Sequence, residues 1–285
     1  MSKRFAAVLA AVLAAFCLPL SAFAAGENTL PVTEDISVSA DYDWDRLADQ
    51  NITLNVYNWG QYISDGTDGS VDVLSAFETL TGIKLNYTTF DTNESLYAKL
   101  KSGGARYDVI FPSDYMVGKM IAEDMLEPLD FANIPNAADV GDAYRGLSYD
   151  PDDAYSVPYT WGLVGLVYNT TMVEGEPDSW DALWDQAYSG QILMFNNSRD
   201  AFAIAARRLG MSLNPANVEE VEQIAQELKA QKPLVQAYVM DEIFDKMEGG
   251  EAAFAPYYVG DALTMMDENP DLGFVIPQEG TNRFV

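Results

Sequence analysis

The chain has 285 residues, of which 48% are apolar, so it can bury a sizeable core and is not a wholly disordered polypeptide. Its 44 acidic residues outnumber 16 basic residues, and the formal net charge of −28 disfavours binding to nucleic acids and anionic lipid surfaces. An acidic surface that only maintains solubility is the alternative explanation of this charge. The sequence has no histidine, which excludes Ser-His-Asp and Cys-His nucleophiles and the zinc-binding HExxH helix.

The start of the sequence has the pattern of a secretory signal peptide. Two basic residues precede an apolar stretch at residues 5–20, and residues 21–25 (SAFAA) offer an A-x-A cleavage site. We therefore predict a signal peptide at residues 1–24 and a secreted protein, periplasmic or at the outer face of the cell. A membrane anchor is the alternative, but the stretch is short for a bilayer span. The one cysteine, Cys17, lies inside it, so the predicted mature chain has no disulfide.

The first half of the predicted mature chain changes from a polar segment to alternating strands and helices. Residues 25–51 are polar and acidic with no sustained period, and we predict a flexible lead-in there. Apolar periodicity then predicts strands and helices in alternation, with strands at 52–56, 83–87 and 107–111 and helices at 71–80, 94–101 and 117–124. This order is typical of an α/β layout with a largely parallel sheet, in which ligands bind beyond the carboxyl ends of the strands.

A second α/β unit begins near Tyr159. Its predicted strands lie at 163–168, 191–195 and 273–276, its helices at 199–209 and 218–228, and further ordered segments at 243–248 and 252–258. The loop at 178–190 carries two tryptophans. We therefore predict an α/β fold with one lobe at 52–160 and a second at 161–285, each a mixed, mostly parallel sheet flanked by helices.

Two loops at predicted strand ends carry side chains suited to ligand contact. Aromatic residues at 57–62 share a turn with Asn58 and Gly60, which favours the rim of a site over the core. The segment Pro112–Tyr115 presents a hydroxyl, a carboxylate and a phenol. Ser113 has neither a histidine nor an adjacent lysine to activate it, so a hydrogen bond to a ligand suits it better than nucleophilic catalysis.

Three further motifs have competing interpretations. The adjacent tyrosines Tyr257 and Tyr258 could supply phenolate oxygens to ferric iron, although side chains alternate along a strand and further ligands would be needed. Asp200 either caps a helix or presents a carboxylate to a ligand. The acidic residues of segment 65–72 lack the spacing of a calcium loop, and we predict a surface turn there.

Four segments resemble bacterial polyamine-binding proteins, the spermidine/putrescine receptors of ABC importers. They read LNVYNWGQYI, SAFETLTGIKLNYTTFDTNESLYAKLKSGGARYDVIFPSDYMV, YSVPYTWGLVGLVYN and SWDALWDQAYSGQILMFNNSRDAF. The similarity runs from about Ile52 to Val285 in order and at the family's spacing. It implies a two-lobed solute-binding protein fold of type II, with an extended polyamine held between the lobes.

The resemblance also implies ligand-binding residues in both lobes. In the first lobe, the family's aromatic loop and serine-tyrosine loop match Trp59, Gly60, Tyr62, Ser113, Asp114 and Tyr115. In the second lobe, the family's acid at the start of a helix matches Asp200, and an acid of spermidine-type members matches Asn197. Its W-x-G-D motif matches Tyr258 and Asp261, and a further aromatic matches Phe284. The family's next aspartate would lie beyond Val285, so we expect a C-terminally truncated chain whose first lobe is incomplete.

The chemistry of these residues fits a polyamine, which carries ammonium groups separated by methylene groups. Carboxylates and hydroxyls can stabilise the ammonium groups, and aromatic rings can pack on the methylene groups and face the cations. We therefore predict a monomeric, non-enzymatic receptor without cofactor or metal that delivers putrescine or spermidine to a membrane permease of an ABC importer. A ferric-ion or other small-solute receptor is one alternative. A carboxylate-based hydrolase or lyase is the other.

Overall fold

The computed structural model describes residues 28–285, and the predicted signal peptide lies outside these residues. The chain divides into two compact units. The first comprises the described part of Met1–Val56 together with Tyr62–Tyr87 and Tyr107–Val109, and the second comprises Tyr57–Gln61, Thr88–Arg106 and Ile110–Val285. This division does not follow the predicted lobe boundaries, which stay a prediction.

The first unit begins with a β-hairpin where the sequence predicted a lead-in without regular structure. Strand β1 (Thr29–Pro31) pairs antiparallel with β2 (Ser37–Ser39), and Leu30 lies opposite Val38. Each strand has three residues, which is too short for alternation of apolar and polar residues to be recognised in the sequence. The 3₁₀-helices η1 (Ala48–Gln50) and η2 (Thr67–Gly69) follow farther along the chain.

Helix α2 (Val73–Thr81) confirms the helix predicted at residues 71–80. Asp72 caps it, because its carboxylate accepts a hydrogen bond from the backbone N–H of Ser75 at 2.9 Å. Gly82 ends it in the left-handed conformation, with φ of 68°. A Cβ atom at Gly82 would also lie 2.6 Å from the Cβ of Ala48, so this position requires glycine for two reasons.

A three-stranded sheet has the order β4-β3-β5 and carries two helices in its connections. Helix α2 lies between β3 (Thr53–Trp59) and β4 (Lys84–Phe90), α3 (Asn93–Lys101) lies between β4 and β5 (Val109–Ile110), and α4 (Asp114–Ala122) follows β5. The predicted strands and helices are thus confirmed, with one correction to the first aromatic loop. Tyr57 and Asn58 belong to β3 and are buried, so they do not lie on a rim; Trp59, the last residue of β3, is half-buried.

The larger sheet lies wholly in the second unit and has six strands. They are β6 (Gly162–Asn169), β7 (Ile192–Phe195), β8 (Val235–Val239), β9 (Phe254–Tyr258), β10 (Leu272–Val275) and β11 (Arg283–Phe284). The order is β10-β6-β9-β7-β8, and β11 also pairs with β6. Strand β7 is parallel to β8 and β9, whereas β6 is antiparallel to β9, β10 and β11. The sheet is therefore mixed as predicted, but its pairings are not mostly parallel.

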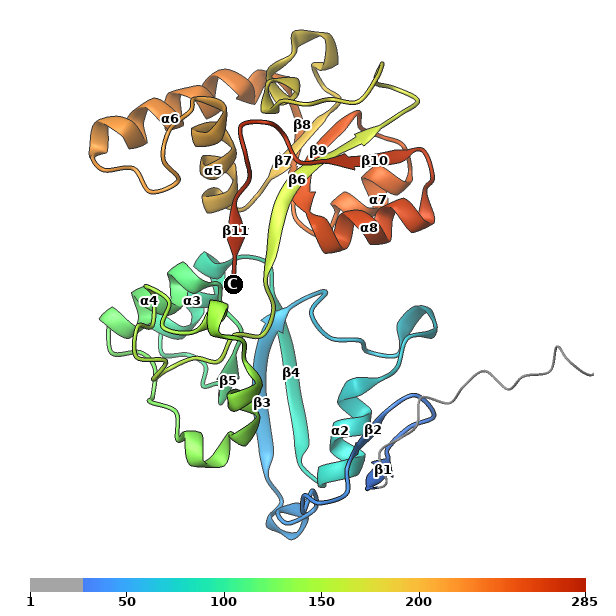
Figure 1. Ribbon diagram of the computed structural model, residues 1–285, viewed down its shortest axis with the longest axis vertical. Helices are drawn as coiled ribbons and strands as arrows, with labels where there is room; N and C mark the ends of the chain where they lie inside the picture. Colours follow the sequence, from blue (N-terminus) through green and yellow to red (C-terminus); the bar gives the residue numbers. More distant parts are fainter. Residues whose placement is uncertain (1–27) are drawn as a thin grey trace, which may run out of the picture. The chain divides into compact units, whose positions relative to one another are not determined.

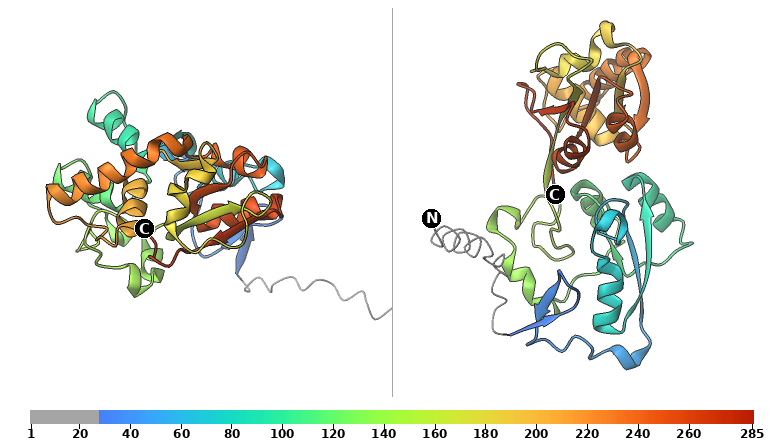
Figure 2. Two further views of the ribbon diagram at one scale, coloured as in Figure 1. Left: turned by 90° about the horizontal axis from the view of Figure 1, so that it is seen from above. Right: turned by 90° about the vertical axis from the view of Figure 1, so that its right-hand side faces the viewer.

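Helices flank this sheet in pairs. Helix α5 (Ser198–Arg208) packs against α6 (Val218–Gln231), and α7 (Ile243–Glu248) packs against α8 (Val259–Glu268). In Figure 1 the first pair lies to the left of the strands and the second pair to the right, and Figure 2 shows the same elements from two further directions. Strand β6 is buried along nearly its whole length, which is typical of a strand covered on both faces.

Short 3₁₀-helices complete the described chain. They are η3 (Phe131–Asn133), η4 (Pro135–Asp139), η5 (Asp142–Tyr144), η6 (Trp180–Trp184), η7 (Gln186–Tyr188) and η8 (Lys232–Leu234). The loop predicted at 178–190 thus contains η6 and η7. Trp180 is fully buried against the core of the larger sheet, and its indole N–H donates to the carbonyl of Gly280 at 2.9 Å. Among residues 28–285, no helix has the length and apolarity that crossing a bilayer requires.

Candidate functional site

Asp200 is the best-defined acidic residue among the predicted site residues. It lies in the first turn of α5, directly after the buried strand β7, and only 5% of it is exposed. The hydroxyl of Tyr258 donates to its Oδ2 at 2.7 Å, and the side-chain amide of Asn282 donates to its Oδ1 at 2.7 Å. Both donors are neutral, so the carboxylate is hydrogen-bonded but its charge is not balanced by them.

Two more predicted site residues contact Tyr258. Asn197 caps α5 by accepting a hydrogen bond from the backbone N–H of Arg199 at 3.0 Å, and its amide nitrogen lies 3.5 Å from the hydroxyl of Tyr258. The ring of Phe284 meets the ring of Tyr258 edge to face, with centroids 5.0 Å apart. The structure therefore brings together four residues that the sequence analysis singled out, namely Asn197, Asp200, Tyr258 and Phe284.

The electrostatics around Asp200 favour the binding of a positively charged ligand. The pKa of Asp200 is raised to about 6, mainly by burial, while the hydrogen bonds from Tyr258 and Asn282 act in the opposite direction. The nearby carboxylates of Asp114 and Glu94 contribute to this rise. A cation placed here would lower the pKa again, because an opposite charge stabilises the ionised carboxylate.

The segment Ser113–Tyr115 at the start of α4 is held by its own hydrogen bonds. Fully buried Asn93 donates to the hydroxyl of Ser113 and accepts from its backbone N–H, both at 3.0 Å. The hydroxyl of Tyr115 donates to Glu94 at 3.0 Å. Burial raises the pKa of Asp114, and Arg199 lowers it.

Arg199 introduces a cation that the sequence analysis did not consider. Its guanidinium carbon lies 4.6 Å from the centre of the Tyr115 ring, a distance typical of a cation–π contact. Arg199 lies one residue before Asp200, so α5 presents a positive and a negative side chain in succession. The face of the Tyr115 ring therefore already accepts a guanidinium group, which shows that it is suited to a cation.

The first aromatic loop places Trp59 and Gly60 in the second unit. The ring of Trp59 packs against Phe90, with centroids 4.5 Å apart, and Gly60 is exposed. Tyr62 belongs to the first unit, so its place in the site stays a prediction.

Asp261 lies in the first turn of α8, three residues after Tyr258, and is half-buried. Burial and, to a smaller extent, the negative charge of Asp241 raise its pKa to about 6. Asp241 was not among the predicted site residues. It follows β8, a strand that the sequence analysis did not recognise, so its position at a strand end was not visible in the sequence.

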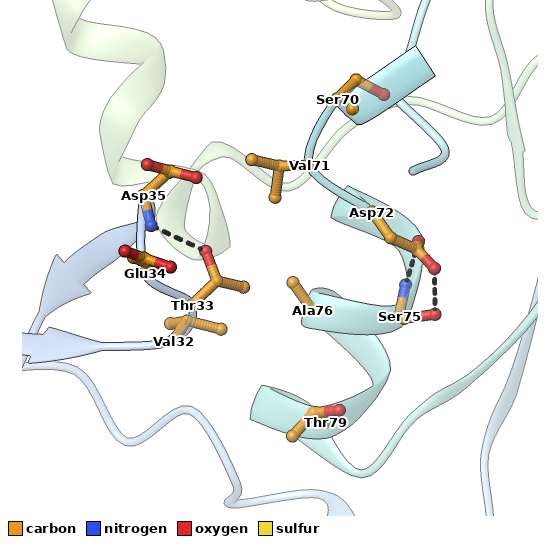
Figure 3. A pocket seen from close by; sticks show the side chains of 11 residues that line it. Val32, Thr33, Glu34, Asp35, Ser70, Val71, Asp72, Ser75, Ala76 and Thr79 are labelled. Carbon is orange, nitrogen blue, oxygen red and sulfur yellow. Dashed lines mark hydrogen bonds between the residues drawn. The ribbon is translucent and has the colours of Figure 1, made fainter. Parts of the chain in front are cut away.

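The pocket of about 360 Å³ drawn in Figure 3 lies in the first unit, between the β1–β2 turn and the start of α2. None of the predicted site residues lines it. Asp72, one of three acidic residues that line it, accepts hydrogen bonds from the backbone and hydroxyl of Ser75, as Figure 3 shows. Nearby Asp65 accepts from the backbone and hydroxyl of Thr67. Segment 65–72 thus forms the predicted turn, and its local hydrogen bonds explain these two carboxylates.

Comparisons with known proteins relate this geometry to a family. The family model of bacterial extracellular solute-binding proteins matches residues 106–285. The spermidine/putrescine-binding periplasmic protein of Escherichia coli K12 is 34% identical over 236 residues, which cover 82% of this chain and 66% of that protein. The chain thus spans slightly less than two thirds of the length of this curated relative.

Two solved structures show the same relationship. A putative spermidine/putrescine ABC transporter from Listeria monocytogenes shares 38% identity with a TM-score of 0.75, over 81% of this chain and 70% of that chain. The spermidine/putrescine substrate-binding protein PotD from Streptococcus pneumoniae shares 37% identity with a TM-score of 0.64, over 82% of this chain and 71% of that chain. They confirm the predicted α/β fold and the predicted resemblance. The chain belongs to the family of bacterial extracellular solute-binding proteins.

Proposed function

We propose that this protein binds putrescine or spermidine outside the cytoplasm and delivers the polyamine to the membrane permease of an ABC importer. The observation that carries the proposal is the buried carboxylate of Asp200, which has two neutral hydrogen-bond donors and aromatic neighbours. Within residues 28–285, no lysine or arginine forms an ion pair with it. An ammonium group of the ligand would supply the missing positive charge.

The remaining parts of the proposed site extend this chemistry along the ligand. Tyr258 and Phe284 would pack on the methylene groups near Asp200, and Tyr115 would offer a further ring. A cation–π contact at such a ring contributes about 0.5–2 kcal/mol. Asp261 would neutralise another ammonium group. The names of the relatives support polyamines as ligands, and the signal-like pattern of residues 1–24 supports export.

We infer binding rather than catalysis, and a monomeric receptor. Ser113 precedes α4, and its side chain and backbone are hydrogen-bonded to Asn93. In the described chain, these contacts provide no base that would activate its hydroxyl. The ferric-ion alternative needs Tyr258 as a phenolate ligand. Its hydroxyl instead donates a hydrogen bond to Asp200, so it keeps its proton, and this observation favours the polyamine.

Isothermal titration calorimetry with a panel of ligands tests the proposal. The panel holds putrescine, cadaverine, spermidine, a neutral sugar and a zwitterionic amino acid. We expect heat and saturation with the polyamines only. Binding of the sugar with no response to any polyamine would overturn the proposal. A visible absorption band after addition of ferric iron would support the iron receptor, and turnover of a glycan that is lost in Asp200→Asn would support the hydrolase.

A further inference from the structure

Three neighbouring parallel strands end close to an aspartate. The sheet order places β8, β7 and β9 side by side, and β7 is parallel to both of the others. Asp200 follows β7, Asp241 follows β8 and Asp261 follows β9. In open α/β sheets, ligands bind beyond the carboxyl ends of such strands. Asp200 and Asp261 belong to the site already described, whereas Asp241 has no assigned role.

Asp241 lies against the aromatic loop of the same site. Its Oδ2 atom would be 2.6 Å from a Cβ atom placed on Gly60, so the carboxylate occupies the space that any larger residue at position 60 would need. Gly60 does not have a positive φ, so its backbone conformation does not require glycine. Glycine at position 60 therefore allows the carboxylate of Asp241 to approach the backbone closely.

Asp241, which is exposed, and Asp261, which is half-buried, carry like charges that act on each other. Burial raises the pKa of Asp241, and Asp91 and Glu242 raise it further, while a hydrogen bond from Tyr257 lowers it. Asp241 in turn raises the pKa of Asp261. In the described part of the chain, neither aspartate is in an ion pair with lysine or arginine.

This pair is a different charge centre from Asp200. Asp200 accepts its hydrogen bond from Tyr258, whereas Asp241 interacts with the neighbouring Tyr257, whose ring centroid lies 5.0 Å from that of Tyr258. The carboxylates that act on Asp200 are Asp114 and Glu94, and the carboxylate that acts on Asp261 is Asp241. Two separate anionic centres match a ligand with two ammonium groups joined by an apolar chain.

We propose that Asp241 is a further ligand-binding residue, which shares with Asp261 the ammonium group that is not bound at Asp200. The proposal rests on the proposed polyamine-binding function and adds to it a residue that binds the second ammonium group. Gly60 serves this arrangement by leaving room for the carboxylate.

The first test compares two variants that each remove one negative charge from the same region. Asp241→Asn removes the negative charge proposed to bind the ammonium group. Asp245→Asn removes an exposed acid of α7 that lies outside the site. Calorimetry with putrescine should show affinity about tenfold to a hundredfold weaker in Asp241→Asn, as expected for loss of a charged hydrogen bond. Asp245→Asn should bind within about twofold of the native chain, because Asp245 is exposed and is not a residue of the proposed site.

The second test uses Gly60 and separates displacement of Asp241 from a direct effect on the ligand. Gly60→Ala should weaken putrescine binding in the native chain, because the new methyl group displaces the carboxylate. In an Asp241→Ala background, the same substitution should change the affinity by less than about twofold, since the displaced group is gone. Thermal unfolding of each variant verifies that it folds.

The outcomes distinguish this inference from the proposed function. If the native chain binds no polyamine, the proposed function fails, and the inference fails with it. If the native chain binds putrescine and Asp241→Asn binds it equally well, the inference alone is overturned. An equal loss in Asp241→Asn and Asp245→Asn would also overturn it, because the effect would then be general electrostatic attraction.

Discussion

Tyr258 donates its hydroxyl hydrogen to Asp200 across 2.7 Å, and this bond joins the end of β9 to the first turn of α5. The two residues are 58 positions apart in the chain. The bond orients one carboxylate oxygen, and Asn282 orients the other. The same tyrosine ring contacts Phe284, so a single side chain links the acidic and the aromatic parts of the site.

The pH dependence of binding follows from the raised pKa values of two aspartates. The pKa is raised to about 6 for both Asp200 and Asp261, mainly by burial. Polyamine ammonium groups stay charged well above neutral pH, as lysine does. Affinity should therefore be constant above pH 7 and weaken as the pH falls through 6, by up to about tenfold per pH unit for each group. Calorimetry between pH 5 and pH 8 measures this, and proton release on binding near pH 6 should accompany it.

The same groups have the opposite effect on the stability of the ligand-free chain. The folded-state pKa of Asp200 lies above its ordinary value of 3.8, so between pH 4 and 6 the folded chain holds a proton that the unfolded chain has lost. Its contribution to the free energy of unfolding should therefore rise as the pH falls from 6 to 4. A flat affinity profile between pH 5 and 7 would contradict these pKa values.

Ionic strength should affect the rate of association. The net charge of −28 attracts a dication over long distances, and salt screens this attraction because the Debye length is about 30 Å at 0.01 M and about 8 Å at 0.15 M. Stopped-flow association with putrescine should be faster at low salt, with a smaller change in the dissociation rate. If the association rate were the same at both salt concentrations, the acidic surface would serve solubility alone.

Asn197 should influence the preference between spermidine and putrescine. It is an amide where spermidine-type relatives were expected to have a carboxylate, and it lies 3.5 Å from the hydroxyl of Tyr258. Aspartate is as good a helix cap as asparagine, so Asn197→Asp should keep α5 intact. Because a charged hydrogen bond contributes about 1.5–3 kcal/mol against about 1 kcal/mol for a neutral one, the variant should gain more affinity for spermidine than for putrescine.

Asp261→Asn is the reciprocal variant for ligand length. It should weaken putrescine binding most, because the second ammonium group of putrescine is expected at Asp261. Affinities for both ligands, measured by calorimetry on both variants, give the spermidine-to-putrescine ratio. An unchanged ratio in both variants would show that neither residue determines ligand length.

The sequence was sufficient to predict the elements that position Asp200. An apolar run followed by Asn197 and a helical pattern predicts a buried strand, a cap and a helix, and all three are present. The acidic first turn of that helix then lies at a strand end, where ligands bind. Local signals of this kind arise from residues close together in the chain.

The contacts of the site could not be predicted in the same way. Asn282 reaches Asp200 from 82 residues away, and only the pairing of β11 with β6 brings the end of the chain to that point. Helix α8 begins with Val259 and Gly260 and has no side-chain cap, so its sequence lacks a start signal. Strand β8 is short and follows a helical turn that contains proline, so its identity depends on pairing with β7.

Binding of the ligand by the Asp200 carboxylate is tested most directly by titrating putrescine into the native chain, Asp200→Asn and Asp267→Asn under identical conditions at pH 7.5. Asp267 is an exposed acid of α8 outside the site and controls for the loss of one charge. We predict saturable binding by the native chain and by Asp267→Asn, and affinity at least about tenfold weaker in Asp200→Asn, with thermal unfolding still cooperative. Equal affinity for putrescine in Asp200→Asn and the native chain would contradict the claim that this carboxylate binds the ligand.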